Sequence, residues 1–395
     1  MHRLKNAFTD LTNKIQAHVP NDEKPQASNT SPHATTTSSS CLAWPPKLTC
    51  APQILGEVTD LSARNYPRDL GRSVSLGGKT YYMFGDTFCF NSSGDFLGVT
   101  NNSIGLLPDL SAPTKSQYLC PEAKVPEFVP YTSEEKEFCD REENKNENIR
   151  LVNWAFGGII EIPGCGGREG WLFYDQVEIH GATPEKQNGT GVARARVTDP
   201  DGAIECERVG AFPLFPSDGP LWGNMSNIAA PDGWTYLLSG KGLDNYMARI
   251  RTDADFSDRS NYLFLKKSGA WEPTYTDPQG PFGELAHDVL CGQGQGAIFY
   301  VPEFAPQGKP YLWIGCEKFP TSQLCMGAAP RPEGPWETHK LGEMPKITEN
   351  AKTRYCIYPH LWGSDLSGGR ILITWSDDGT MGGKVAAAIF TFALD

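Results

Sequence analysis

Short runs in which apolar and polar residues alternate recur along most of the chain, with glycine-rich turns between them. The stretch RDLGRSVSLGGKTYYMFGDTF, residues 68–88, shows the pattern most clearly, because two alternating runs flank Gly77-Gly78. Alternation with a period of two is typical of half-buried β-strands. A Gly-Gly pair between two such runs predicts a tight hairpin, since glycine accepts the positive φ that two-residue turns require. Strong helix-forming runs are scarce, so we expect an all-β protein.

The hairpin is the first of five similar units. Each unit contains a strand, a turn, an aromatic strand that ends in a polar residue, and a third strand rich in small residues. The first two strands of the units are expected in residues 73–87, 157–176, 227–241, 296–318 and 359–378, and the third strands in residues 99–107, 190–197, 244–252, 322–330 and 382–392. Fourth strands are expected in residues 203–210, 261–273 and 334–342.

This repeat predicts a five-bladed β-propeller of four-stranded antiparallel blades. The fifth unit ends after three strands, and residues 52–58 could supply the missing edge strand and close the ring. A β-sandwich is the competing all-β architecture, but five similar units at long spacing favour the propeller.

Two polar segments set the predicted domain boundaries. Residues 21–40 are rich in Ser and Thr and offer no apolar surface, so we expect residues 1–50 to be a disordered tail and residues 51–395 to be a single propeller domain. Residues 121–150 are expected to be an insertion whose charge-rich part, 131–150, forms a solvated loop or a short helix.

The net charge of −12 and the pI of about 5.1 argue against nucleic acid or an anionic membrane as a partner, because both require clustered Lys and Arg. The charge suits a neutral ligand instead. The first 20 residues lack the apolar segment of a secretory signal, which predicts a cytoplasmic protein as the sequence is written. Five N-x-S/T sequons point the other way, so a different N-terminus would predict secretion.

No cofactor or metal site is expected. The 11 cysteines show no C-x-x-C spacing, and the glycine-rich CGQGQG segment at 291–296 lacks the βαβ context of a phosphate loop. Glu284 and His287 could ligate a metal only on a helix, and the prolines and glycines around them favour a loop.

Asp69 and Asp86 lie at the two free ends of the first hairpin. With Gly77-Gly78 as the turn, the numbers of facing residues add up to 155, so the two carboxylates should face each other across the strands unless a bulge intervenes. Two adjacent carboxyls titrate as a coupled pair, one with a raised pKa. A glycosidase needs such a general acid beside a base or nucleophile. Alternatively, one Asp pairs with Arg68 or Arg72 and the other caps a turn.

Equivalent positions of the other blades should converge with this pair on a central pocket. The starts of the innermost strands contribute Asn153, Trp154, Trp222, Asn224, Gln293, Gln295, Tyr358 and His360. The ends of the second strands contribute Asp175, Lys241, Glu317 and Asp377. Amides and acids bind hydroxyl groups and indole rings stack on sugars, so the set indicates a carbohydrate or another polyhydroxylated small molecule. Alone, a propeller Trp or His360 is more often a core residue.

The motif of Arg68, Asp69, Gly71, Ser73 and Phe84-Gly85-Asp86-Thr87 resembles the domain of unknown function 4185, whose bacterial members are the endo-D-arabinanases of glycoside hydrolase family 183. The chain is more distantly similar to the five-bladed propeller glycosidases of family 43, in which a catalytic-base Asp precedes a strand like Tyr81–Gly85. The resemblance implies catalytic roles for Asp69 and Asp86, and we also expect Arg68 of this motif to bind the ligand.

Two departures from family 43 limit which catalytic residues can be assigned from the resemblance. NWAFGG, residues 153–158, has Gly158 where family 43 has an Asp, and LWGNMSN, residues 221–227, lacks the family's acid Glu. We therefore predict a glycoside hydrolase acting on arabinofuranosyl-type furanosides, with Asp69 as base or nucleophile and Asp86 as acid. The alternatives are a non-catalytic glycan-binding propeller and an intracellular tailoring enzyme that acts on a small non-sugar metabolite.

Overall fold

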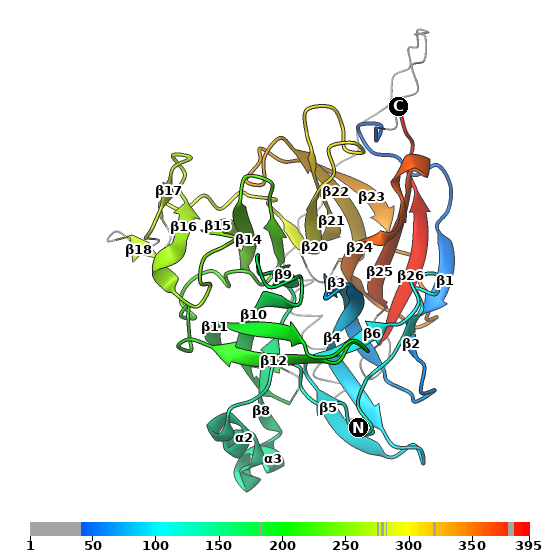
Figure 1. The fold of residues 1–395 in the computed structure, drawn as a ribbon, viewed down its shortest axis with the longest axis vertical. Coiled ribbons are helices and arrows are strands. Elements are labelled where there is room, and N and C mark those ends of the chain that lie inside the picture. Colours follow the sequence, from blue (N-terminus) through cyan, green and yellow to red (C-terminus); the bar gives the residue numbers. More distant parts are fainter. Residues whose placement is uncertain are drawn as a thin grey trace.

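The computed structural model describes residues 41–395 except 182, 275, 278–279, 282, 319–320 and 378–382. Five antiparallel sheets surround a common centre, and each sheet forms one blade of a β-propeller (Figure 1). The predicted architecture is therefore confirmed. Most strands overlap the segments in which alternation predicted them, and Gly77 and Gly78 both adopt positive φ in the first hairpin.

The blades follow one another in chain order and run outward from the innermost strand. Blade 1 contains β3 (Arg68–Leu76), β4 (Lys79–Phe90) and β6 (Ser103–Leu107), and β5 (Phe96–Thr100) pairs antiparallel with the C-terminal part of β4. Blade 2 contains β8 (Ile149–Trp154), β9 (Ile159–Glu161), β10 (Glu169–His180), β11 (Thr183–Val197) and β12 (Ile204–Val209). Blade 3 contains β13 (Ser226–Ala229), β14 (Trp234–Lys241), β15 (Asp244–Arg251), β16 (Tyr262–Leu265) and β17 (Trp271–Glu272).

Blades 4 and 5 complete the ring. Blade 4 contains β20 (Gln293–Tyr300), β21 (Tyr311–Glu317), β22 (Gln323–Ala329) and β23 (Glu337–Glu343). Blade 5 contains β24 (Arg354–Asp365), β25 (Arg370–Asp377), β26 (Lys384–Thr391) and β1 (Gln53–Glu57). The remaining short elements are β2 (Thr59–Asp60), β7 (Lys115–Ser116), β18 (Thr276–Asp277), β19 (Gly280–Pro281), η1 (Arg259–Asn261) and η2 (Leu366–Gly368).

The ring is closed by its N-terminal strand. β1 pairs antiparallel with β26, so the prediction that residues 52–58 complete the fifth blade is confirmed. The structured chain begins before the predicted boundary at residue 51, because Leu42 is fully buried and forms a bridge with Leu394. Leu48 forms a second bridge with Phe392, so residues 41–50 belong to the fold. The predicted disorder of residues 1–40 lies outside the described residues.

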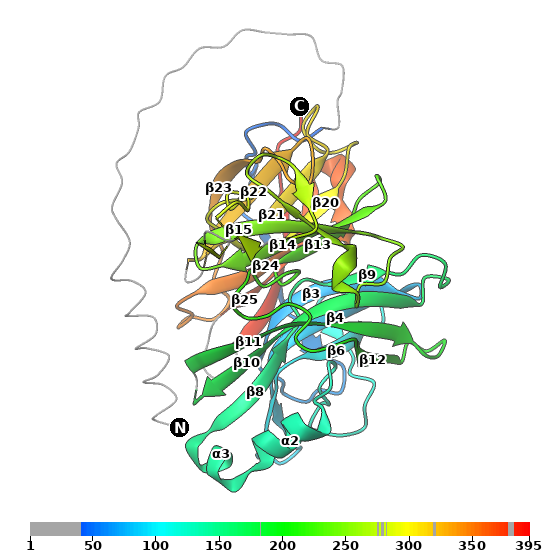
Figure 2. The ribbon, with the colours of Figure 1, turned by 90° about the vertical axis from the view of Figure 1, so that its left-hand side faces the viewer.

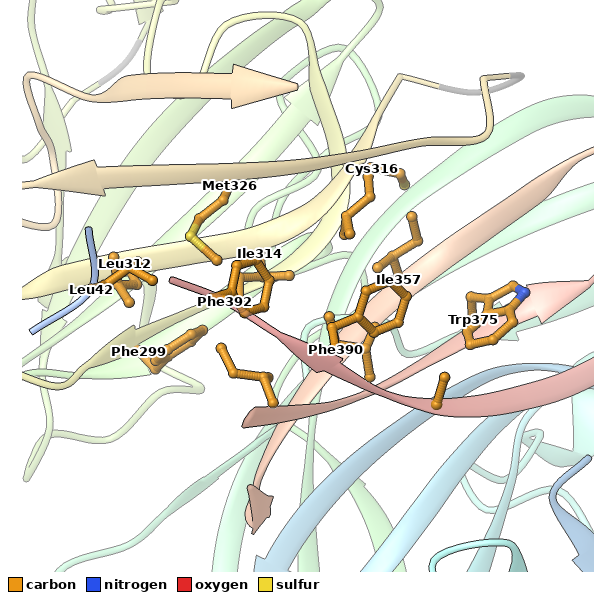
Figure 3. Close-up of a cluster of buried hydrophobic side chains, with 14 of the residues drawn as sticks. Leu42, Phe299, Leu312, Ile314, Cys316, Met326, Ile357, Trp375, Phe390 and Phe392 are labelled. Carbon is orange, nitrogen blue, oxygen red and sulfur yellow. The ribbon is translucent and has the colours of Figure 1, made fainter. Parts of the chain in front are cut away.

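Apolar side chains fill the space between neighbouring blades. Figure 3 shows the cluster between blades 4 and 5, where Ile314 and Met326 meet Ile357 and Phe390. Leu42 packs into the same cluster, which explains why the segment before β1 is held against the ring. Burying large aliphatic and aromatic side chains contributes about 1.5–3 kcal/mol each, so these interfaces stabilise the arrangement of the blades.

The polar insertion contains two short helices, α2 (Ser133–Asp140) and α3 (Glu142–Glu147), which lie beside β8 (Figure 2). A capping box between Thr132 and Glu135 begins α2. The Glu135 side chain also accepts hydrogen bonds from Gln176 and Arg208 of blade 2. The charge-rich part of the insertion is therefore helical, as one of the two alternatives predicted, and it is fixed to blade 2 by partly buried polar contacts.

Arg72 of β3 occupies the centre of the ring. Its Nη1 atom donates hydrogen bonds to three backbone carbonyls: Phe156 of blade 2 at 3.2 Å, Met225 of blade 3 at 3.4 Å and Gly296 of blade 4 at 3.2 Å. Its guanidinium carbon lies 5.1 Å from the centroid of the Tyr358 ring in blade 5. A single side chain of blade 1 thus contacts the innermost segments of all four other blades.

We expect Arg72→Met to lower the free energy of unfolding by at least about 3 kcal/mol, because three buried carbonyls lose a charged donor at about 1–3 kcal/mol each. Urea unfolding followed by tryptophan fluorescence measures the change. The matched control is Arg331→Met, since Arg331 is exposed. Equal stability losses in the two variants would contradict a central role for Arg72.

Candidate active site

A pair of register shifts repositions the two aspartates of the first hairpin. Arg68 faces Thr87 and Arg72 faces Met83, as the turn predicts, but Leu70 faces Phe84 between them. Leu70 and Gly71 both have a φ of 76°, in the left-handed region. The expectation that Asp69 and Asp86 face each other directly is therefore wrong, because a local bulge places Gly85 and Asp86 together opposite Asp69.

Asp69 extends across the strand toward Gly85. A Cβ atom at residue 85 would lie 2.3 Å from Asp69 Oδ1, so only glycine leaves room for this carboxylate. On its other side, the Tyr355 hydroxyl donates a 2.8 Å hydrogen bond to Asp69 Oδ2. A hydrogen bond of this kind stabilises the negative charge of a carboxylate. Asp69 is thus held at the junction of blades 1 and 5.

Asp86 lies at the junction of blades 1 and 2. Trp154 Nε1 donates a hydrogen bond of 3.3 Å to Asp86 Oδ1. Burial raises the pKa of Asp86, and the charge of Arg150 and the Trp154 hydrogen bond only partly oppose this shift. Burial and the Asp86 charge also raise the pKa of Glu127, to about 7, although Glu127 accepts hydrogen bonds from the backbone amides of Asn101 and Asn102.

A cavity of about 420 Å³ opens beside Trp154 and is lined by residues of blades 2, 3 and 4. This volume falls within the range of small-molecule sites. The lining residues combine aromatic, polar and charged groups with glycines; they are Trp154, Phe156, Asp175, Val177, Gln187, Ser217, Gly219, Leu221, Asn224, Met225, Gly240, Lys241, Gly242, Gly294, Gln295 and Lys318.

Asp175 is the carboxyl group in the described part of the cavity lining. It pairs with Trp154 across β8 and β10, so the indole lies between Asp86 and Asp175. The Thr190 hydroxyl donates a 2.9 Å hydrogen bond to Asp175 Oδ1. Burial raises the pKa of Asp175 to about 7, against the opposing effect of hydrogen bonds from Thr190 and Asn224. A carboxyl with a pKa near neutrality can donate a proton at physiological pH.

The predicted ligand-binding residues divide into two groups. The structure brings Trp154, Asp175, Asn224 and Gln295 together in the cavity lining, with Lys241. It places Arg68, Asn153, Trp222, Gln293, Glu317, Tyr358, His360 and Asp377 outside that lining.

Two of the excluded side chains, Arg68 and His360, have clear structural partners. Arg68 is 1% exposed, lies over the Phe84 ring and donates to Ser116 Oγ, so neither Arg68 nor Arg72 pairs with a hairpin aspartate. His360 is a core imidazole between Ser73 and Thr374, and burial lowers its pKa to about 3.

The other excluded residues are also accounted for. Trp222 and Tyr358 are fully buried, Trp222 against Phe215 and Phe264. Asn153 is likewise fully buried, Glu317 pairs with Lys340, and the Asp377 carboxylate accepts the amides of Ile347 and Thr348. Gln293 is buried and donates to Cys291 O.

Local features of the strands explain why these predicted residues lie outside the cavity lining. β24 begins at Arg354, earlier than predicted, so Tyr358 and His360 lie deep in the ring and Tyr355 takes the position near the rim. An irregularity between Gln293 and Gly296 separates the environments of Gln293 and Gln295. In blade 2, successive residues point to opposite faces, which places Trp154 in the cavity and Asn153 in the core.

Sequence reasoning missed Phe156, Gln187 and Lys318. Phe156 follows the point where the innermost strand of blade 2 is interrupted between β8 and β9, and its ring stacks on Trp154 at a centroid distance of 5.8 Å. The glycines at 157 and 158 signal this interruption in the sequence. Lys318 directly follows the polar end of β21, so the rule of strand ends missed it by one residue.

The described part of the chain contains no group of three or more His, Cys, Asp or Glu side chains that could hold a metal ion. No helix among the described residues has the length and apolar character needed to span a bilayer.

No protein-family model and no curated protein matches this sequence. The fold is similar to that of a candidate hydrolase from Bacteroides ovatus, with a TM-score of 0.55 and 14% identity over 87% of each chain. It is also similar to a β-1,3-galactosidase of glycoside hydrolase family 43, with a TM-score of 0.51 and 14% identity over 87% of this chain. The match spans 60% of the galactosidase. At this identity, the likeness establishes a shared five-bladed propeller fold.

We expect the Asp175 carboxyl to titrate near pH 7, which ¹³C NMR of the side-chain carboxyl would detect and Asp175→Asn would remove. Because the folded pKa exceeds the unfolded pKa, the unfolded chain releases this proton first, and the stability of the wild type should decline between about pH 4 and pH 7. Asp175→Asn should reduce this decline. A midpoint near pH 4 would contradict the burial argument.

Proposed function

We propose that the protein is a glycoside hydrolase that acts on furanosides of the arabinofuranosyl type. The observation that supports this proposal is the position of Trp154, whose indole binds the Asp86 carboxyl and also lines a polar cavity next to Asp175. Carboxyl groups beside an aromatic surface suit the cleavage of a glycosidic bond, since the ring can stack on a sugar while a carboxyl donates a proton.

The two hairpin aspartates have environments that suit different roles. Asp69 accepts the Tyr355 hydroxyl, which favours its ionised form, and we assign it as base or nucleophile. Burial raises the pKa of Asp86, which favours its protonated form, and we assign it as the general acid. The resemblance to family 43 implies the base position for Asp69 alone, and the acid role of Asp86 is inferred from its environment.

Asp175 is an alternative proton donor, because it lines the cavity and its pKa is raised to about 7. Neither Asp69 nor Asp86 belongs to the cavity lining, so a substrate that occupies the cavity must extend past Trp154 to reach them. The three carboxyls therefore lead to distinguishable outcomes when each is replaced.

We expect the wild type to hydrolyse at least one of aryl α-D-arabinofuranoside, α-L-arabinofuranoside and β-D-galactofuranoside. Asp86→Asn and Asp69→Asn should each lower kcat by about 100-fold or more, as is typical when an acid or base is lost. The wild-type rate should also fall as pH rises above the raised pKa of the acid, because the acid must be protonated.

Three comparisons make this test decisive. Asp201→Asn is the matched control, since Asp201 is exposed and outside the site. A collapse of activity in Asp175→Asn, with Asp86→Asn active, would transfer the acid role to Asp175. Sugar binding without turnover by folded wild type would instead support a non-catalytic glycan-binding propeller.

A further inference from the structure

The cavity has a local charge opposite to that of the whole protein. Among the residues that the structure describes, the titratable side chains that line it are Lys241, Lys318 and Asp175. Asp175 has a pKa of about 7 and is therefore only partly ionised at neutral pH. Two ammonium groups thus face one partial negative charge, within a chain whose net charge is −12.

Lys241 has a structural role in the cavity wall. Its Nζ atom donates hydrogen bonds to the backbone carbonyls of Ser217, Asp218 and Gly219. Ser217 and Gly219 themselves line the cavity, so Lys241 holds this loop in place. The Lys241 ammonium group is therefore already hydrogen-bonded to the backbone of the cavity wall.

Lys318 differs from Lys241 in its contacts. Among the described residues, its Nζ atom forms one long hydrogen bond, of 3.5 Å, to the backbone carbonyl of Asp244, and it forms no salt bridge. A Cβ atom at Gly240 would lie 3.0 Å from Lys318 Nζ, so the ammonium group reaches from blade 4 to the cavity-lining end of β14. Burial lowers the pKa of Lys318 to about 8, which leaves it mostly charged at pH 7.

A polar donor lies in the same lining. The Gln187 Nε2 atom is buried and has no hydrogen-bond partner among the described residues. An ammonium group and an amide donor that line one cavity can each bind an oxygen of the same ligand. Unpaired buried donors are costly, so a ligand that satisfies them gains affinity.

We propose that the cavity binds a sugar that carries a carboxylate, of the uronic acid class, and that Lys318 recognises the carboxylate. The inference rests on the proposed function only in taking the ligand to be a carbohydrate. A singly charged carboxylate fits better than a phosphate dianion for two reasons. Of the two lysines in the described lining, Lys318 forms a single long hydrogen bond whereas Lys241 forms three, and Asp175 would repel a second negative charge. Trp154 and Phe156 supply the aromatic surface for the sugar ring.

Saturation-transfer NMR with non-hydrolysable monosaccharides tests this inference independently of turnover. The ligands are glucuronic acid and galacturonic acid, their neutral counterparts glucose and galactose, and glucose 6-phosphate. The proteins are the wild type, Lys318→Met and the control Lys346→Met, since Lys346 is exposed and outside the cavity. Circular dichroism confirms that each variant is folded.

We expect the wild type to bind both uronic acids more tightly than the neutral sugars. Lys318→Met should weaken uronic acid binding about tenfold, which equals about 1.4 kcal/mol, and should leave the neutral sugars unchanged. Lys346→Met should behave as the wild type does. The affinity for uronic acids should fall as the pH rises past about 8, because Lys318 then loses its charge. The titratable groups around Lys318 contribute to the same pH profile; they are Asp175, Lys241, Asp244, Cys291 and Cys316.

Three results would overturn the inference: equal binding of uronic acids and neutral sugars, no effect of Lys318→Met, or no sugar binding by folded protein. Tighter, Lys318-dependent binding of glucose 6-phosphate would overturn the choice of carboxylate. Furanoside turnover without a uronic acid preference would refute this inference alone. Lys318-dependent uronic acid binding without furanoside turnover would support it and refute the proposed substrate.

Discussion

The hydrogen bonds of Arg72 to the carbonyls of Phe156, Met225 and Gly296 are the interaction on which the ring depends. Inner strands of a propeller meet at the axis without pairing with one another, so their facing carbonyls need a donor. A guanidinium suits this position because its several N–H groups diverge in one plane. Gly158 makes room for it, since a Cβ atom there would lie 2.6 Å from Arg72 Nε.

The same contact shapes the cavity. Arg72 binds the carbonyl of Phe156 at the interruption between β8 and β9, where the chain leaves the regular strand. The residues around this interruption, Trp154 and Phe156, stack on each other and line the cavity. Met225 of blade 3, whose carbonyl also accepts a hydrogen bond from Arg72, lines the cavity as well. Arg72 therefore holds in place two backbone segments that line the cavity.

The blades could be predicted from the sequence because their signals are local. Alternation around Gly77-Gly78 defines the first hairpin, and the missing fourth strand of the last unit points to β1. The site could be predicted only in part, because side-chain direction depends on bulges that tertiary contacts impose. Leu70 adopts a positive φ although it is not glycine, and nothing in the local sequence indicates that Asp69 will turn toward Gly85. Lys318 was not predicted because its ammonium group contacts blade 3, and no local sequence pattern indicates that contact.

The groups that surround the Arg72 guanidinium also affect the pKa values of the carboxyls in the site. Among the described residues, its guanidinium contacts carbonyl dipoles and the Tyr358 ring, and no carboxylate. An arginine paired with Asp86 or Asp175 would lower the pKa of that carboxyl by stabilising its charged form. Since Arg72 binds dipoles instead, burial dominates and the pKa values of both carboxyls are raised. A buried cation thus organises the ring without lowering the pKa of either carboxyl.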